Sequence, residues 1–358
     1  MEERKMILKM IEDGKITAEE GLKLLEALED GKSSEQQTTA VSTNVNWSEG
    51  REERQQRHFS SSASKFTSFL ESAFQKIKDF DLDFNFGTSI DIDHIFQHRE
   101  ISPKSLDISL ENGSIEIIPW DEPDVRIECQ AKVYRVKDSE EARRVFLQES
   151  RFNVDAEKLV FQTKVKYMKT HTVVYVPKTS FDLIKLYTFN GQIKGKPIVV
   201  DTLDVNTLNG GLSFDAVTAK KVMAETVNGS IELKQLDVHL IDAKTIHGGI
   251  TLLGQMQDVD VETINGTVTY ELTSLTKDGY ADLKATTGSI NITLPDALRV
   301  EGKLKTNVGG FLVDVPDHEV LSEKKEFAAK SLSFVARKEA QPTIKINATT
   351  NTGSISTK

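Results

Sequence analysis

One pattern repeats in four consecutive stretches of the chain: LDVNTLNGGLSF (203–214), VMAETVNGSIEL (222–233), IDAKTIHGGITL (241–252) and VDVETINGTVTY (259–270). In each stretch, apolar residues stand seven and five positions before a glycine and two and four positions after it, and a threonine stands three before it. Successive side chains of a strand point to opposite faces, so this alternation places all five side chains on one face. We predict that this face forms the core.

The glycines of the pattern recur at a nearly constant interval. The spacings are 19, 19, 19, 18, 22 and 21 residues along Gly191, Gly210, Gly229, Gly248, Gly266, Gly288 and Gly309, and Gly353 comes last. Periods of this size are typical of solenoids, in which each repeat stacks on the next. We therefore predict a mainly β protein built as a parallel β-solenoid, with coils of about 18–22 residues.

Turn residues stand between the two strands of each repeat. They form a predicted turn ladder of Asn209, Gly210, Asn228, Gly229, Gly248, Asn265 and Gly266. We expect a bend with positive φ here, because glycine reaches that region freely and asparagine tolerates it. Asn-Gly also favours β-hairpins, which makes an antiparallel meander the alternative. Identical residues at identical offsets favour the parallel stack, with threonines and asparagines in hydrogen-bonded ladders.

The chain before the repeats divides by composition into three segments. Residues 1–31 are predicted to form a helical hairpin, with a capping box at Thr17 and Glu20, that needs a partner or a second copy to bury its apolar stripes. A DNA-binding helix-turn-helix is the rival, but its acidic second helix would repel phosphates. Residues 32–64 have the composition of a disordered linker. Residues 65–100 are predicted to hold an amphipathic helix and a connector, and residues 101–358 the β-solenoid, interrupted by a helix near residues 138–150.

Large apolar residues recur at helical spacing in residues 65–79. They are Phe66, Phe69, Leu70, Phe74 and Ile77. Such a face either caps the open end of the β-solenoid or inserts into a membrane interface or a partner's groove. Both interpretations stay open, and we favour the cap.

Composition excludes several classes of protein. A net charge of −10 and a pI near 5.4 argue against a nucleic-acid partner, since such proteins need clustered lysine and arginine. A single cysteine, Cys129, cannot form an internal disulfide or a cysteine metal site. The start lacks the apolar region of a signal peptide, and no apolar run reaches roughly 18 residues. We expect a protein of the cytoplasm or one bound peripherally to the cell membrane.

Two groups of possible metal ligands lack the residue spacing of known metal-binding motifs. Asp81, Asp83 and Asn85 resemble the start of a calcium loop, but the glycine falls one place late and Ile92 stands where a bidentate glutamate is needed. His94 and His98 are four residues apart without an HExxH motif around them. We therefore predict no metal site.

Signals for catalysis are equally weak. Phosphate-loop, dinucleotide and GxSxG motifs are missing, so we predict no cofactor and no catalytic residue. Acidic residues that could serve a hydrolase on a β-helix are Asp201, Asp204, Asp215, Asp242, Asp258 and Asp260. Their offsets within the repeat differ, and we expect each to be a solvated residue near a coil corner.

The chain resembles a known bacterial family at three places. IEDGKITAEEGLKLLEAL (11–28) is similar to the SHOCT-like N-terminal helical module of YvlB- and LiaX-like proteins of Gram-positive bacteria. LENGSIEIIPWDEPDV (110–125) and TTNTGSIS (349–356) are similar to the candidate-adhesin β-domain of the same proteins. The resemblance implies a role in the cell-envelope stress response, linked to membrane-active antimicrobial peptides and to exposure at the cell surface. It supplies no catalytic residues.

These observations predict a non-catalytic binding or scaffold protein. We expect the N-terminal hairpin to recruit a protein partner or a second copy, and the chain to contact a membrane peripherally rather than nucleic acid. The alternative is a carbohydrate-active enzyme on a β-helix. Such an enzyme needs a groove with converging carboxylates and shifted pKa values.

Overall fold

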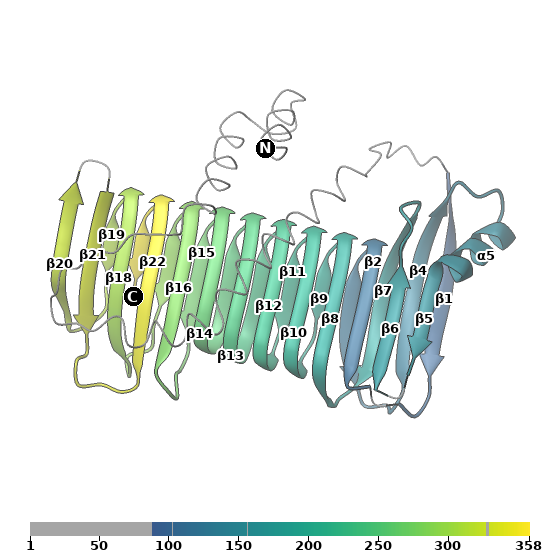
Figure 1. Cartoon of the computed structure of the whole chain (residues 1–358), viewed down its shortest axis with the longest axis horizontal. Helices are drawn as coiled ribbons and strands as arrows, with labels where there is room; N and C mark the ends of the chain where they lie inside the picture. The colour runs from purple at the N-terminus through teal and green to yellow at the C-terminus, as the bar shows by residue number, and fades with distance from the viewer. Residues whose placement is uncertain (1–87, 102, 156, 327–328) are drawn as a thin grey trace, which may run out of the picture. The chain divides into compact units, whose positions relative to one another are not determined.

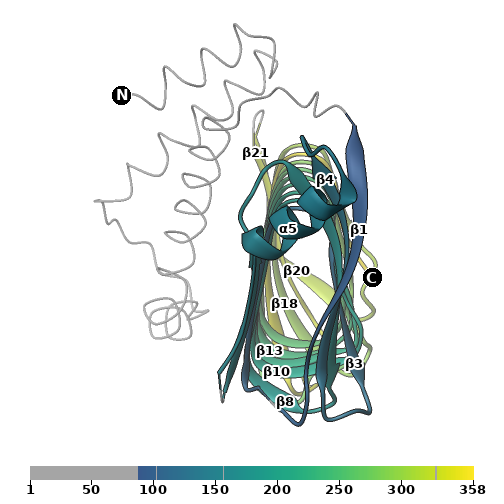
Figure 2. The same ribbon diagram turned by 90° about the vertical axis from the view of Figure 1, so that its right-hand side faces the viewer.

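The computed structural model describes residues 88–358, apart from residues 102, 156 and 327–328. Contacts divide the chain into two compact units, Met1–His58 and Phe59–Lys358. The described residues form one α-helix and 23 strands, joined in one hydrogen-bonded sheet (Figure 1). The sheet is wrapped into a flattened tube with two walls, and apolar side chains fill the space between them (Figure 2). The predicted mainly β solenoid is confirmed.

The first wall, called the long wall, is parallel between β6 and β18 and antiparallel at both ends. Its spatial order is β5 (Ser150–Val154), β6 (Lys158–Thr163), β2 (Ser105–Asn112), β8 (Ser180–Asn190), β10 (Ile198–Asn209), β12 (Val217–Asn228), β13 (Ile231–His247), β14 (Ile250–Asn265), β16 (Gly279–Thr287), β22 (Thr343–Thr352), β18 (Arg299–Val308), β21 (Ala329–Ala336) and β20 (His318–Glu326).

The second wall is called the short wall, because its strands from β3 onward are shorter than those they face. Its order is β1 (Ser89–His98), β4 (Val125–Tyr134), β7 (Met168–Pro177), β3 (Ile115–Trp120), β9 (Ile193–Gly195), β11 (Leu212–Asp215), the first residues of β13 and β14, β15 (Val268–Leu272), β17 (Ile290–Thr293), β23 (Ile355–Thr357) and β19 (Phe311–Val313). Strands β13 and β14 bend from the short wall into the long wall, with a register irregularity between Leu233 and Leu236.

The sequence period equals one coil of the solenoid. Val205 pairs with Ala224, which pairs with Ala243, so residues 19 positions apart lie side by side in parallel strands. Their side chains point inward and are buried, as are those of Leu203, Val222 and Ile241. The parallel pairing shows that these Asn-Gly pairs join the two walls of a coil and do not close hairpins.

The order of the coils in space differs from their order in the sequence at both ends. The last coil, β22 and β23, lies between β16–β17 and β18–β19. At the other end, the coil of β2 and β3 lies between β6–β7 and β8–β9. Each insertion pairs strands that are far apart in the sequence.

The two ends of the tube differ. Helix α5 (Ser139–Glu149) begins at Asp138, whose carboxylate accepts a 2.8 Å hydrogen bond from the backbone N–H of Glu141, and it lies at the N-terminal end (Figure 2). Its Phe146 is fully buried next to the aromatic rings of Phe96. At the other end, the exposed edge strand β20 carries Glu319 and the run Glu323–Glu326, and these charges discourage pairing with another sheet edge.

Candidate functional site

The most regular feature is the turn edge, where the strands of the long wall end at Asn190–Gly191, Asn209–Gly210, Asn228–Gly229, His247–Gly248 and Asn265–Gly266 (upper edge in Figure 1). Its asparagines form a ladder across successive coils. The side-chain amide of Asn228 donates to Asn209 at 2.8 Å, Asn209 donates to Asn190 at 2.7 Å, and Asn190 donates to Asn112 at 2.7 Å. Asn112 ends the ladder by donating to the carbonyl of Lys166 at 2.7 Å.

A second ladder runs inside the turn edge. The hydroxyl of Thr207 donates to the carbonyl of Gly191 at 3.0 Å, and Thr226 and Thr245 donate to Gly210 and Gly229, both at 2.9 Å. The three threonines are at most 1% exposed. Each hydroxyl is therefore satisfied within the fold, at the carbonyl of the preceding coil.

The expected positive φ at these glycines is wrong. Gly210, Gly229, Gly248 and Gly266 lie outside the left-handed region, whereas Gly113 has φ +135°. The requirement is steric: a Cβ on Gly210 would lie 1.8 Å from the carbonyl oxygen of Gly191. Glycine is needed here because consecutive coils approach so closely.

A shallow groove of about 490 Å3 lies at the N-terminal end of the turn edge. The residues around it are Asn112, Gly113, Ser114, Tyr134, Lys166, Lys169, Asn190, Gly191, Gln192 and Asn209. Beside it, the hydroxyl of Ser114 shares a hydrogen bond with Nδ1 of His171. Side-chain amides, hydroxyls and two lysines suit a ligand that carries both hydroxyl and anionic groups. None of these lining residues is acidic, so the groove has no carboxylate pair for glycoside hydrolysis.

The expectation of unequal offsets and solvated positions is wrong for several of the acidic residues. Asp204, Asp242 and Asp260 share one offset, six before the glycine, and Asp242, Asp260 and Asp282 are paired in register on the outer surface of the long wall. Asp242 and Asp260 are only 5% and 8% exposed, so they are not solvated corner residues. Strand alternation produces the row, because the same offset points outward in every coil.

On two of these strands, a lysine two residues further along pairs with the aspartate of this row. Lys244 lies 2.9 Å from Asp242, and Lys284 lies 3.0 Å from Asp282. Burial raises the pKa of Asp260 to about 6, although Lys284 and Lys244 oppose that shift. The row lies along a wall and not across a cleft, so it is an ion-pair network on a surface.

The other predicted residues fall into two groups. Phe66, Phe69, Leu70, Phe74 and Ile77 lie outside the described residues, as do the N-terminal hairpin, the linker and residues 81–87. His94 and His98 lie on strand β1, where the His94 ring is 4.4 Å from that of Phe96. Between residues 88 and 358, the structure brings together no group of three or more histidine, cysteine or acidic side chains able to hold a metal. No described helix has the length and apolar character needed to cross a membrane.

Comparison with known proteins follows the same division of the chain. Residues 103–357 match the family model of Toastrack DUF4097, and residues 2–33 match that of the SHOCT-like domain. The chain is 38% identical over 361 aligned positions to the uncharacterized protein YvlB of Bacillus subtilis (strain 168), covering 100% of this chain and 98% of that protein.

The chain also resembles solved structures of low sequence identity. A candidate adhesin from Bacteroides fragilis matches with 12% identity and a TM-score of 0.40, over 75% of this chain and 97% of that one. A candidate cell adhesion protein from Clostridium sporogenes matches with 10% identity and a TM-score of 0.25, over 75% and 99%. The resemblance stated from the sequence is confirmed by the family models and by the relative: the chain belongs to the Toastrack DUF4097 family and is a YvlB-like protein with a SHOCT-like N-terminal domain.

Proposed function

We propose that this protein is a non-catalytic binding protein of the bacterial cell envelope that acts in the response to envelope stress. The solenoid binds an anionic, hydroxyl-rich polymer of the envelope through the groove at the turn edge. The SHOCT-like N-terminal domain recruits a protein partner or a second copy of the chain. The protein works at the membrane surface, on the cytoplasmic or the outer side.

The groove carries this proposal. Lys166 and Lys169 lie beside an amide ladder whose members are held in place by 2.7–2.8 Å hydrogen bonds. Donors fixed in this way lose little conformational entropy when a ligand binds. Their spacing follows the strand separation of about 4.8 Å, which suits a ligand with repeating units. Lysine adds a charge-assisted contact to phosphate or carboxylate groups.

Co-sedimentation of the purified full chain with cell-wall fragments tests this binding. We expect Lys166→Glu with Lys169→Glu to weaken binding about tenfold or more, because two charge-assisted contacts become repulsive. Wild-type binding should weaken as salt is raised, since exposed charges are screened. Fragments stripped of their anionic polymers should bind poorly.

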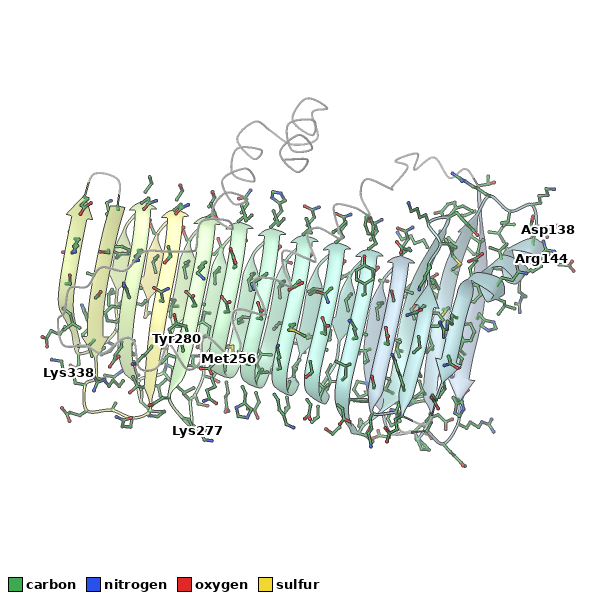
Figure 3. The ribbon with its side chains drawn as sticks, viewed as in Figure 1. Asp138, Arg144, Met256, Lys277, Tyr280 and Lys338 are labelled. Carbon is green, nitrogen blue, oxygen red and sulfur yellow. The ribbon has the colours of Figure 1, made fainter. Side chains whose placement is uncertain are left out.

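The matched control reverses two exposed lysines elsewhere, Lys277 and Lys305, and so makes the same change in net charge. Figure 3 shows Lys277 at the edge opposite the turn edge. The control should bind like wild type. Equal loss in both double variants would contradict a specific groove, and release of soluble sugars from the fragments would favour the carbohydrate-active enzyme instead.

Cell experiments address the envelope role. A strain lacking the protein should be more sensitive to a cationic, membrane-active peptide, and the Lys166→Glu, Lys169→Glu variant should fail to restore resistance. Protease treatment of intact cells, with lysed cells as control, would report the side of the membrane. Unchanged sensitivity of the deletion strain would refute the proposed role.

A further inference from the structure

Two equivalent ion pairs on the long wall differ sharply in exposure. Asp242–Lys244 and Asp282–Lys284 occupy the same register positions of parallel strands, on β13 and β16, with β14 between them. The Lys284 side chain is 45% exposed, as expected on the outside of a sheet, whereas that of Lys244 is 2% exposed. The strand pairing is equivalent at both positions and does not explain the difference. We infer that a further segment covers the outer face of β13 and does not extend to β16.

An apolar stripe accompanies the buried ion pair. Phe189, Leu208 and Ile246 are 2%, 1% and 4% exposed although they point away from the core, and Phe189 and Leu208 form a cluster separate from it. Each stands one residue before the turn edge on β8, β10 and β13. We call this region the outer patch; it consists of Phe189, Leu208, Val227, Ile246, Glu225, Asp242, Lys244 and Asp260.

The described elements do not account for this burial. Strands β12 and β13 pack against their neighbours in the two walls, β10, β11 and β14. Helix α5 packs against β1, β4 and β5 at the end of the tube. Between residues 88 and 358, no helix or strand therefore lies over the outer patch.

We propose that residues 65–79 dock across strands β8 to β14 and cover the outer patch with Phe66, Phe69, Leu70, Phe74 and Ile77. These residues belong to the compact unit Phe59–Lys358, which also contains the solenoid. As a helix, 15 residues span about 22 Å. The patch crosses five strands, and four spacings of about 4.8 Å give about 19 Å.

The chain can reach the patch from where the described residues begin. Strand β1 starts at Ser89, which pairs with Tyr134 at the groove, so residue 88 lies near the turn edge, as the apolar stripe does. Residues 80–88 extend to about 30 Å at most. That length covers about six strand spacings, and β9, the strand that follows β8 in the same coil, lies four spacings from β1, so residue 79 can reach the end of the patch at β8.

The net charge of residues 65–79 is opposite in sign to that of the outer patch. The outer patch contains Glu225, Asp242 and Asp260 against Lys244, a net charge of −2. Residues 65–79 contain three lysines, one glutamate and one aspartate, a net charge of +1. Helix α5 already covers the N-terminal end of the tube, which is the end nearest to residue 88.

Thiol labelling of the full chain tests the cover. Ile246→Cys places a thiol under the segment, and Thr286→Cys places one in the same outward row, two strands away and only half-buried. Native Cys129 is 1% exposed, and burial raises its pKa to about 12, so it should not react in the folded protein. We expect the thiol at position 246 to react about tenfold or more slowly than that at 286. Equal rates would overturn the proposal.

A second set of variants tests the occupant. In the Ile246→Cys chain, Phe69→Asp with Phe74→Asp should raise the labelling rate to that of Thr286→Cys. Ser68→Asp with Gln75→Asp, on the opposite face of the same predicted helix, adds the same charge and should leave the protection unchanged. Protection that persists in a folded Phe69→Asp, Phe74→Asp chain would overturn the assignment, as would protection that disappears on dilution, which would indicate a second copy.

A photo-crosslinking residue at position 70 keeps the test valid if the aspartate variants do not fold. Irradiated full chain should yield intramolecular crosslinks to peptides from β8 to β14, identified by mass spectrometry. Crosslinks confined to the ends of the tube, or to another molecule, would refute docking on the long wall.

Discussion

Replacing Gly210 with alanine should strongly destabilise the solenoid, because the added methyl group would clash with the backbone of the preceding coil. The new Cβ would lie 1.8 Å from the carbonyl oxygen of Gly191, and the gap must grow by 1.6 Å to reach the ordinary contact distance of 3.4 Å. Three of the hydrogen bonds that join the two coils lie at this contact. They are Thr207 to Gly191 at 3.0 Å, Gly191 N–H to Asn209 at 2.9 Å, and Asn209 to Asn190 at 2.7 Å.

The expected loss follows from these contacts. Each of the three hydrogen bonds contributes about 1 kcal/mol to stability. Forcing extra volume into a tightly packed region costs about 1–3 kcal/mol more. We therefore expect Gly210→Ala to lower the free energy of unfolding by about 4–6 kcal/mol.

Urea unfolding followed by circular dichroism measures this loss as a shift in midpoint. The neighbouring Gly211→Ala is the control, because its Cβ would come no closer than 3.4 Å to Ser230 and its φ also lies outside the left-handed region. That variant should stay within about 1 kcal/mol of wild type. A Gly210→Ala protein as stable as Gly211→Ala would refute the steric explanation of the glycine period.

Three further substitutions test other parts of the fold. Thr226→Asp should destabilise by about 4 kcal/mol or more, since Thr226 is 0% exposed and the charge would have no partner, whereas the exposed Asp237→Ala should leave the thermal midpoint unchanged. Phe146→Ala should cost about 3–5 kcal/mol in urea unfolding by opening a cavity under α5. Burial raises the pKa of Asp260 from 3.8 to about 6, so the folded state binds more protons between these values and stability falls as pH rises from about 4 to about 6, by about 3 kcal/mol. Asp260→Asn should remove that slope from urea midpoints measured across this range, and an unchanged slope would contradict the assignment.

Local pattern was enough to predict the coil. The alternation of Leu203, Val205 and Thr207 defines an inward face, and its recurrence 19 residues later predicts parallel stacking, because a strand's side chains alternate wherever the strand is placed. The helix predicted near residues 138–150 is also present, as α5 (Ser139–Glu149). The positive φ proposed for Gly210, Gly229, Gly248 and Gly266 was wrong, although Gly288, Gly309 and Gly353 of the same period do have positive φ. The closeness of Gly191 to Gly210 exists only between coils, so the sequence did not reveal it.

The tertiary structure decided everything that depends on which coils are neighbours. The insertion of β22 and β23 between earlier coils, and of β2 and β3 at the other end, pairs strands that no sequence period connects. The groove combines the Asn112 turn with Lys166 and Lys169 from the later coil of β6 and β7, so its composition follows from that insertion. The sequence by itself therefore determined the length, the inward face and the internal ladders of one coil, because these depend on strand alternation and on identical neighbours. Only the tertiary structure decided the order of the coils, the groove and the buried charges of the outer patch, because each depends on a contact between residues that are distant along the chain.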